Sequence, residues 1–367
     1  MPATGCRQPA AQRDGIVEME PERSIRDTGS IEPHPAARRL FPVGRPLRLL
    51  AGLALLSAMS VSTAEPDGRF SVVAGWPDGG PDAALGQATG VGVDSRNRVW
   101  VFHRADRIWR EPFPAEPITR PTIAVFDGDS GRLLKTLGGG RFVMPHGLTI
   151  DSEDNVWITD VALHQVFKFD PEGKLLLSLG EARRSGNDNA HFNRPTDVAV
   201  LSDGSFYVAD GYGNSRVMKF SREGVFAYSW GKKGTAPGEF DTPHAIAVDA
   251  AGRVHVADRG NRRVQLFDAR GRFLAEWTDS RLGRPYSLAL SPRYGIVVDG
   301  GDQTGCAYRE RSQAAIVGDG GTVLGSFGRY GSGMGQFRMA HDVALARDGA
   351  AYIVEAEGRR IQKFIRR

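Results

Sequence analysis

From about residue 86 to the C-terminus, short apolar runs alternate with polar turns that contain Asp, Gly or Asn. This pattern predicts β-strands joined by tight turns, because runs of about four to six apolar residues suit strands and those polar residues suit turns. No long stretch has the 3.6-residue period of an amphipathic helix. We therefore expect an all-β fold.

One strand-turn-strand pattern recurs six times in units of about 40 to 50 residues, which is the length of a propeller blade. In several units a fourth strand follows the third, as in the segments that end at Gly180, Gly231 and Thr278. Neighbouring units must stack, because no blade buries both of its faces alone. The sequence thus predicts a six-bladed β-propeller that forms one domain.

Three units depart from the pattern. The first carries a Pro-rich insertion from Trp109 to Thr122. The fifth, from Tyr286 to Gly328, is degenerate, so we expect it to keep mainly its first and last strands. The sixth ends after its third strand, whereas the segment that begins at Arg69 matches the fourth-strand pattern. We predict that this N-terminal strand completes the last blade and closes the ring.

One position of the repeat predicts a metal site. From the first unit to the sixth it is occupied by Thr89, His146, Thr196, His244, Tyr286 and His341. The histidines are 98 and 97 residues apart, so a closed ring would direct three imidazoles at a common axis. Three neutral imidazoles suit zinc or another first-row metal and leave one coordination position free for water or substrate. The alternative is that these histidines only cap loops at the mouth of the channel.

A second set of candidates lies in the loop after the second strand. Arg104 and Arg259 occupy equivalent positions there, and Tyr212 lies one residue further on. An arginine beside a metal suits a substrate carboxylate, which it can hold through two parallel hydrogen bonds. A nearby cation and a metal favour the tyrosinate form, which suits Tyr212 to act as a base. The alternative is that these residues form salt bridges and packing contacts between blades.

The N-terminus has the features of an export signal. An apolar segment starts at Leu47, and small residues follow it up to a suitable cleavage position between Ala64 and Glu65. This order is typical of a secretory signal peptide, with a retained membrane anchor as the alternative. We expect a leader over residues 1–64, a propeller over residues 65–367, and export to the periplasm or out of the cell, with a membrane tether only through an uncleaved leader.

The net charge bears on possible partners, and the cysteine content bears on possible disulfides. The full chain has a formal net charge of +4, and removing the leader, with eight Arg and six Asp or Glu, leaves +2. This balance, without a basic stripe interleaved with aromatic residues, argues against nucleic-acid binding. Cys6 would leave with the leader, so Cys306 would have no disulfide partner. We expect a monomer whose ring is closed by strand pairing.

Several motifs resemble a known enzyme family, and the repeats look like NHL repeats. The most specific motif is TDVALHQVFKF at Thr159. The others are FHRADRIW at Phe102, MPHGLTID at Met144, VADGYGNSR at Val208, PHAIAVD at Pro243, ADRGNRRVQ at Ala257 and AHDVALA at Ala340. Together they resemble the peptidyl-α-hydroxyglycine α-amidating lyases, over the chain from about Arg69 onward.

The resemblance implies two metal ions in a six-bladed propeller enzyme. By this resemblance, zinc is held by His146, His244 and His341. A structural calcium ion is held by the backbone carbonyls of Val91 and Leu148 and by the carboxylate of Asp342. Hard oxygen ligands of this kind suit calcium.

The resemblance also implies the reaction and its residues. It assigns catalysis to Arg104, Tyr212 and Arg259. The substrate is a peptide that ends in α-hydroxyglycine, or a related small amide, and zinc-dependent cleavage of its C–N bond gives an amide and glyoxylate. Tyr212 would take the proton of the substrate hydroxyl, and the two arginines would hold the negative charges.

Two other hypotheses fit the same fold. An exported NHL propeller can bind a peptide, a glycan or a protein and keep the metal for structure, since propellers serve many functions. A calcium-dependent lactonase of the propeller class is the second, but such sites consist of carboxylates and Asn. Three axial histidines argue against that second hypothesis.

Overall fold

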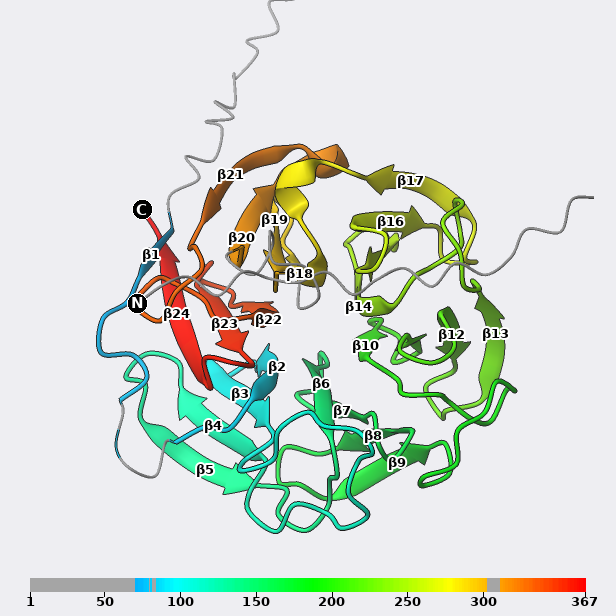
Figure 1. Ribbon diagram of the computed structural model, residues 1–367, viewed down its shortest axis with the longest axis horizontal. Coiled ribbons are helices and arrows are strands. Elements are labelled where there is room, and N and C mark those ends of the chain that lie inside the picture. The colour runs from blue at the N-terminus through cyan, green and yellow to red at the C-terminus, as the bar shows by residue number, and fades with distance from the viewer. Residues whose placement is uncertain (1–69, 79, 81–83, 302–310) are drawn as a thin grey trace, which may run out of the picture. The chain divides into compact units, whose positions relative to one another are not determined.

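The computed structural model describes residues 70–78, 80, 84–301 and 311–367 of the chain. These residues form six four-stranded sheets arranged in a ring, and the strands nearest the centre are β2, β6, β10, β14, β18 and β22 (Figure 1). The chain divides into the units Met1–Ala64 and Glu65–Arg367. The predicted leader and both cysteines lie outside the described residues.

Blades one to three pair their strands in chain order, and all pairs are antiparallel. Blade one contains β2 (Ala88–Val93), β3 (Arg98–His103), β4 (Ile123–Asp127) and β5 (Leu133–Leu137). Blade two contains β6 (Pro145–Ile150), β7 (Val156–Asp160), β8 (Gln165–Phe169) and β9 (Leu175–Leu179). Blade three contains β10 (Asp197–Val200), β11 (Phe206–Asp210), β12 (Arg216–Phe220) and β13 (Phe226–Trp230).

Blades four and five repeat this arrangement, with two short 3-10 turns beside them. Blade four contains β14 (Pro243–Val248), β15 (Val254–Asp258), β16 (Arg263–Phe267) and β17 (Phe273–Trp277). Blade five contains β18 (Pro285–Leu290), β19 (Gly295–Asp299), β20 (Gln313–Val317) and β21 (Val323–Phe327). The 3-10 turns are η2 (Ser280–Leu282) and η3 (Asp319–Gly321).

The sixth blade joins the two ends of the propeller, as predicted. Its strands are β22 (Ala340–Leu345), β23 (Ala351–Glu355), β24 (Arg360–Arg366) and the N-terminal β1 (Phe70–Val72). Strand β1 pairs antiparallel with β24, from Phe70 opposite Arg366 to Val72 opposite Phe364. This pairing removes the free edge that β24 would otherwise present. The observed strand is shorter than the predicted segment, and Arg69 lies outside the described residues.

The prediction for the fifth blade is wrong, because all four of its strands are formed. Strands β19 and β20 pair from Gly295 opposite Val317 to Asp299 opposite Gln313. Their sequences, GIVVD and QAAIV, lack the turn signature of the other units, and four of the five residues of each run are apolar or Gly. Such runs form strands when neighbouring blades bury them on both sides. Blade five therefore lacks the turn residues of the other units but has the apolar runs that form strands.

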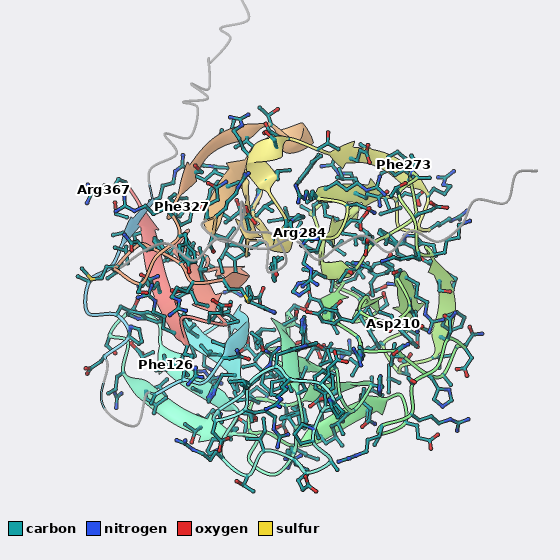
Figure 2. All side chains as sticks on the ribbon, in the orientation of Figure 1. Phe126, Asp210, Phe273, Arg284, Phe327 and Arg367 are labelled. Atoms are coloured by element: carbon teal, nitrogen blue, oxygen red, sulfur yellow. The ribbon has the colours of Figure 1, made fainter. Side chains whose placement is uncertain are left out.

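The apolar core lies between the blades. Each of the six buried clusters combines residues of two neighbouring blades, and the cluster around Trp100 and Phe142 is an example from blades one and two. Phe126 and Phe327, labelled in Figure 2, belong to two other clusters. Because every core is shared, the blades stabilise one another only in a closed ring.

The described residues include no helix with the length and apolar character needed to cross a bilayer.

An aspartate shapes the turn between the first two strands of a blade. In blade two, Asp151 Oδ1 accepts hydrogen bonds from the backbone N–H groups of Glu153 and Asn155, both at 2.9 Å. Its Oδ2 accepts the indole N–H of Trp157 at 2.9 Å. Asp94 makes equivalent contacts in blade one. The recurring Asp therefore fixes the turn and anchors a buried residue of the second strand.

Candidate metal centre and active-site cavity

The three axial histidines converge as their spacing predicts. His146, His244 and His341 are buried, and each offers one nitrogen that lies within 4.8 Å of the other two. Their ring centroids are 4.7 to 5.0 Å apart. The set can therefore hold one metal ion between three imidazoles.

A β-bulge turns each of these side chains toward the axis. The pairing of the first and second strands shifts register at the repeat position in five of the six blades, for example between Pro243 and Ala245, on either side of His244. A bulge adds one unpaired residue and re-aims its side chain. The same irregularity around the ring explains why one repeat position supplies all three ligands.

The non-histidine members of the repeat position orient the histidines. The Nδ1 atom of each histidine lies 2.6 to 2.8 Å from a backbone carbonyl of the next blade, at Thr196, Tyr286 and Thr89 respectively. A carbonyl only accepts hydrogen bonds, so each Nδ1 carries the hydrogen and each Nε2 keeps its lone pair. The three lone pairs are thus free for a metal at the axis.

Burial also keeps the three rings neutral. It lowers the pKa of His146 to about 3, with a further contribution from the charge of Arg104. Burial lowers the pKa of His244 and of His341 well below the ordinary histidine value. The neutral imidazole is the form that binds metals, so the cluster suits a metal at neutral pH.

Tyr212 lies directly beside the histidine nitrogens. Its hydroxyl oxygen is 3.1 Å from Nε2 of His146 and 3.0 Å from Nε2 of His244. Arg259 Nη1 donates to the same oxygen at 3.3 Å, and its guanidinium carbon lies 5.2 Å from the Tyr212 ring centroid. A phenolic oxygen in this position can exchange a proton with a substrate that enters the metal site.

Arg104 is held more rigidly than Arg259. Its Nε donates to the carbonyl of Pro145 at 3.1 Å, and its Nη1 donates to Gln87 Oε1 at 2.8 Å. Burial lowers the pKa of Arg104 to about 10, so the group stays protonated at neutral pH. Arg104, Tyr212 and Arg259 are therefore brought together around the histidines, as the sequence predicted, and the arginine that contacts Tyr212 directly is Arg259.

Arg104, Tyr212, Arg259 and one of the three histidines, His341, line one cavity of about 610 Å³. Its lining includes Gln87, Arg104, Trp109, Tyr212, Arg259, Tyr286, Tyr330, Arg338, His341 and Glu357. Three arginines and a histidine in this lining suit a small anion, and the aromatic residues add apolar surface. The cavity has the size range of a small-molecule site.

A pair of partly buried carboxyl groups, Asp197 and Asp342, forms a second layer, one repeat position after that of the histidines. Asp342 Oδ2 accepts the N–H of Val91 at 2.8 Å, and its Oδ1 accepts the hydroxyl of Ser287 at 2.5 Å. Asp197 is the carboxyl group that sequence reasoning missed. Burial raises the pKa of both groups, to about 7 for Asp342, and the charge of Asp342 raises that of Asp197 further. The mutual repulsion of the two carboxylates would be relieved by protonation or by a cation.

The signal for Asp197 was present in the repeats. It follows Thr196 as Asp342 follows His341, so both occupy one repeat position. Oδ2 of Asp197 accepts the N–H of Ile246 in the next blade at 3.0 Å. Of the two predicted backbone ligands, Val91 contacts Asp342 through its N–H, and Leu148 packs against Gly90, the neighbour of Val91. The proposed calcium residues thus come from one small region of the inner strands.

Comparison with known proteins identifies related chains. The NHL repeat family matches residues 142–169 and 192–220. Peptidyl-glycine alpha-amidating monooxygenase B of Xenopus laevis is 36% identical over 317 residues, which cover 79% of this chain and 35% of that protein. The chain thus spans about a third of the length of this longer relative.

Two relatives of more similar length carry different names. Peptidyl-alpha-hydroxyglycine alpha-amidating lyase 2 of Drosophila melanogaster is 34% identical over 311 residues, which cover 77% of this chain and 71% of that protein. NHL repeat-containing protein 3 of Homo sapiens is 31% identical over 313 residues, which cover 79% of this chain and 82% of that protein.

Solved structures agree with the propeller architecture. Virginiamycin B lyase from Staphylococcus aureus has a TM-score of 0.52 and 12% sequence identity, over 81% of this chain and 98% of that chain. At this identity the likeness concerns the fold alone. The extent of the match to the Drosophila lyase decides the family, because most of both chains aligns at 34% identity. This chain belongs to the family of the peptidyl-alpha-hydroxyglycine alpha-amidating lyases.

Proposed function

We propose that this protein is a zinc-dependent lyase that cleaves a peptide ending in α-hydroxyglycine into a peptide amide and glyoxylate. The observation that carries the proposal is a cluster of three buried imidazoles, two of which contact the hydroxyl of Tyr212, a residue that lines the cavity. The names of its relatives support the same reaction.

The reaction needs two proton transfers, one to Tyr212 and one from it, and the cleavage of one C–N bond. Tyr212, as tyrosinate, accepts the proton of the substrate hydroxyl, and the electron pair of that O–H bond forms the C=O bond of glyoxylate. The C–N bond breaks, and the amide nitrogen receives the proton, so no oxidant or covalent nucleophile is needed. Arg259 donates to the Tyr212 oxygen and stabilises its negative charge.

Arg104 and the metal have separate parts in this proposal. Arg104 is fixed by Gln87 and by the carbonyl of Pro145, so its charge holds the substrate carboxylate in one orientation. Zinc, held by the three histidines, supplies Lewis acidity toward a substrate oxygen. The Nδ1 hydrogen bonds to the backbone keep the three Nε2 atoms aimed at the axis.

We further propose that the carboxylate layer holds a structural calcium ion. Asp342 and Asp197 offer hard oxygen donors, Val91 contacts Asp342, and Leu148 packs against Gly90 beside Val91, so the four residues come together although they are far apart in sequence. Oxygen donors without nitrogen favour calcium over zinc. The ion would neutralise two acids that otherwise repel each other.

The remaining proposals concern the whole chain. Residues 1–64 are a leader that directs export and can tether the protein to a membrane only if it is not cleaved. The mature propeller acts as a monomer without a nucleic-acid partner, in line with its near-neutral charge.

The test combines metal analysis with a glyoxylate assay. The purified protein is expected to hold about one zinc ion per chain after dialysis and to release glyoxylate from an N-acylated α-hydroxyglycine. The double variant His146→Ala/His244→Ala is expected to lose both. Stoichiometric zinc in that variant would disprove the site assignment.

A binding scaffold is the second candidate, because a human relative of similar length is named only for its repeats. In that case the zinc would be retained and no glyoxylate would form. A zinc-loaded protein that releases no glyoxylate from any α-hydroxyglycine peptide would favour the scaffold.

A further inference from the structure

We propose that Trp109 determines substrate specificity, by receiving the side chain of the residue that precedes α-hydroxyglycine. Trp109 begins the Pro-rich insertion of blade one, residues 109–122, and its half-buried ring lines the cavity. This inference rests on the proposed lyase function. It assigns a recognition role to a segment that the repeat pattern left unexplained.

The position of Trp109 is fixed from the side of blade one. Its backbone N–H donates to Gln87 Oε1 at 3.1 Å, and the same oxygen accepts Arg104 Nη1 at 2.8 Å. The guanidinium carbon of Arg104 lies 5.0 Å from the Trp109 ring centroid. A single amide group therefore sets the distance between the indole and the arginine that is proposed to hold the substrate carboxylate.

The indole also packs directly against the proposed base. The ring centroids of Trp109 and Tyr212 are 5.2 Å apart, and Phe113 packs on Trp109 in a T-shaped contact, with the centroids 4.9 Å apart. Contacts of this geometry favour one ring orientation over others. Trp109 thus contacts both the proposed base and another aromatic residue of its own insertion.

An ion pair fastens the insertion to blade three. Glu111 accepts two hydrogen bonds from Arg194, at 2.9 and 3.0 Å, and the Arg194 guanidinium carbon lies 5.2 Å from the Phe113 ring centroid. The backbone carbonyl of Arg194 accepts the N–H of Tyr212 at 3.4 Å. Arg194 therefore connects the insertion with the loop that carries the proposed base, and the insertion spans from blade one to blade three.

The chemistry of the cavity favours this assignment. Consecutive residues of an extended peptide are about 3.5 Å apart, so a side chain next to the reacting carbon reaches an indole that contacts Tyr212. The groups around the histidines are charged and suit the carboxylate, whereas the Trp109 ring is apolar. An aromatic or large aliphatic side chain gains most from such a surface.

Two peptides that differ only at this residue test the proposal. N-acetyl-Phe-α-hydroxyglycine and N-acetyl-Gly-α-hydroxyglycine are compared by glyoxylate release from the full zinc-loaded protein. We expect kcat/KM to be about tenfold higher for the Phe peptide, a ratio typical of one aromatic contact. Trp109→Ala is expected to reduce this ratio to about one, mainly by raising KM for the Phe peptide, and Trp109→Phe is expected to restore most of it.

The ion pair has a matched control on the ring. Glu153 makes a similar exposed pair with Arg222, at 2.6 and 2.9 Å, and neither residue lines the cavity. Glu111→Gln is expected to lower the Phe-to-Gly ratio severalfold, whereas Glu153→Gln leaves both rates unchanged. Equal ratios in these two variants would refute the role of the ion pair.

The outcomes separate the two proposals. An active Trp109→Ala protein that keeps the wild-type ratio would refute the specificity role and leave the lyase function intact. If Trp109→Ala fails to fold, Trp109→Leu gives the same comparison with a smaller apolar side chain. Wild-type protein that releases no glyoxylate from either peptide would overturn the proposed function and this inference with it.

Discussion

The histidine layer and the carboxylate layer occupy consecutive repeat positions around the ring, yet they suit different ions. His341 belongs to the first layer and Asp342 to the second. The histidines direct their Nε2 atoms at one another and at the Tyr212 hydroxyl beside the cavity, whereas the carboxylates accept hydrogen bonds from neighbouring blades. Free lone pairs beside a cavity suit catalysis, and oxygen atoms that bridge blades suit structure. A substitution in one layer should therefore leave the other layer intact.

The largest expected effect is a loss of turnover on substitution of Tyr212, which lies beside the histidine layer. Tyr212→Phe removes the hydroxyl that contacts two histidines and Arg259, so turnover of an α-hydroxyglycine substrate should fall by about a hundredfold or more. The melting temperature and zinc content should change little, because the ring stays in place. Tyr228→Phe, on the outer strand of blade three, is the control with unchanged turnover. Wild-type turnover in Tyr212→Phe would assign the base to another group.

Deletion of the N-terminal strand β1 should open the ring and disrupt the histidine layer and the carboxylate layer together. Phe70 stacks on Phe327 of blade five with centroids 4.7 Å apart, and Trp76 packs on Tyr352 of blade six at 4.9 Å. Deletion through residue 77 removes both contacts and the β1 pairing, at a cost of at least about 3 kcal/mol of unfolding free energy. Deletion through residue 64 should leave a folded, active protein. If both proteins melt alike and stay equally soluble, β1 does not close the propeller.

The sequence predicted the ring and the histidines because both depend on repetition. Apolar alternation fixed the strands, and one repeat position fixed His146, His244 and His341. Periodicity could not show that bulges turn these residues inward or that carbonyls of the next blade orient them. Those features depend on contacts between blades, which no local pattern records.

Asp197 and the blade-one insertion were both missed from the sequence, for different reasons. Asp197 shares its repeat position with Asp342, so a second pass along the repeats would have found it. Trp109 lies in a segment without a counterpart in other blades, and its contact with Tyr212 joins residues more than a hundred positions apart. A repeat pattern predicts residues that recur in each blade, whereas the contacts of a non-repeated insertion are known only from the folded structure.

A smaller effect is expected in the carboxylate layer. Calcium at about 1 mM should raise the melting temperature of the wild-type protein by roughly 5 °C, because the ion binds only the folded ring. Asp197→Asn should abolish this shift while zinc content stays near one per chain. Asp203→Asn, an exposed acid in the same blade, is the control that keeps the calcium response. A full rise in melting temperature with calcium in Asp197→Asn would show that Asp197 does not bind the calcium ion.

The smallest effect tests how the non-histidine members of the repeat position support the metal site. The Thr196 hydroxyl lies within hydrogen-bonding distance of the carbonyls of Pro243 and Ala209, at 2.8 and 3.0 Å, while its own carbonyl accepts His146 Nδ1 at 2.7 Å. Thr196→Val removes the hydroxyl and keeps the carbonyl, so it should cost only about 1 kcal/mol of unfolding free energy. Zinc content, measured by elemental analysis, and turnover should match the wild type. Loss of zinc in Thr196→Val would mean that the hydroxyl, rather than the backbone carbonyl, aligns His146, and the histidine layer would then depend on side-chain contacts between blades.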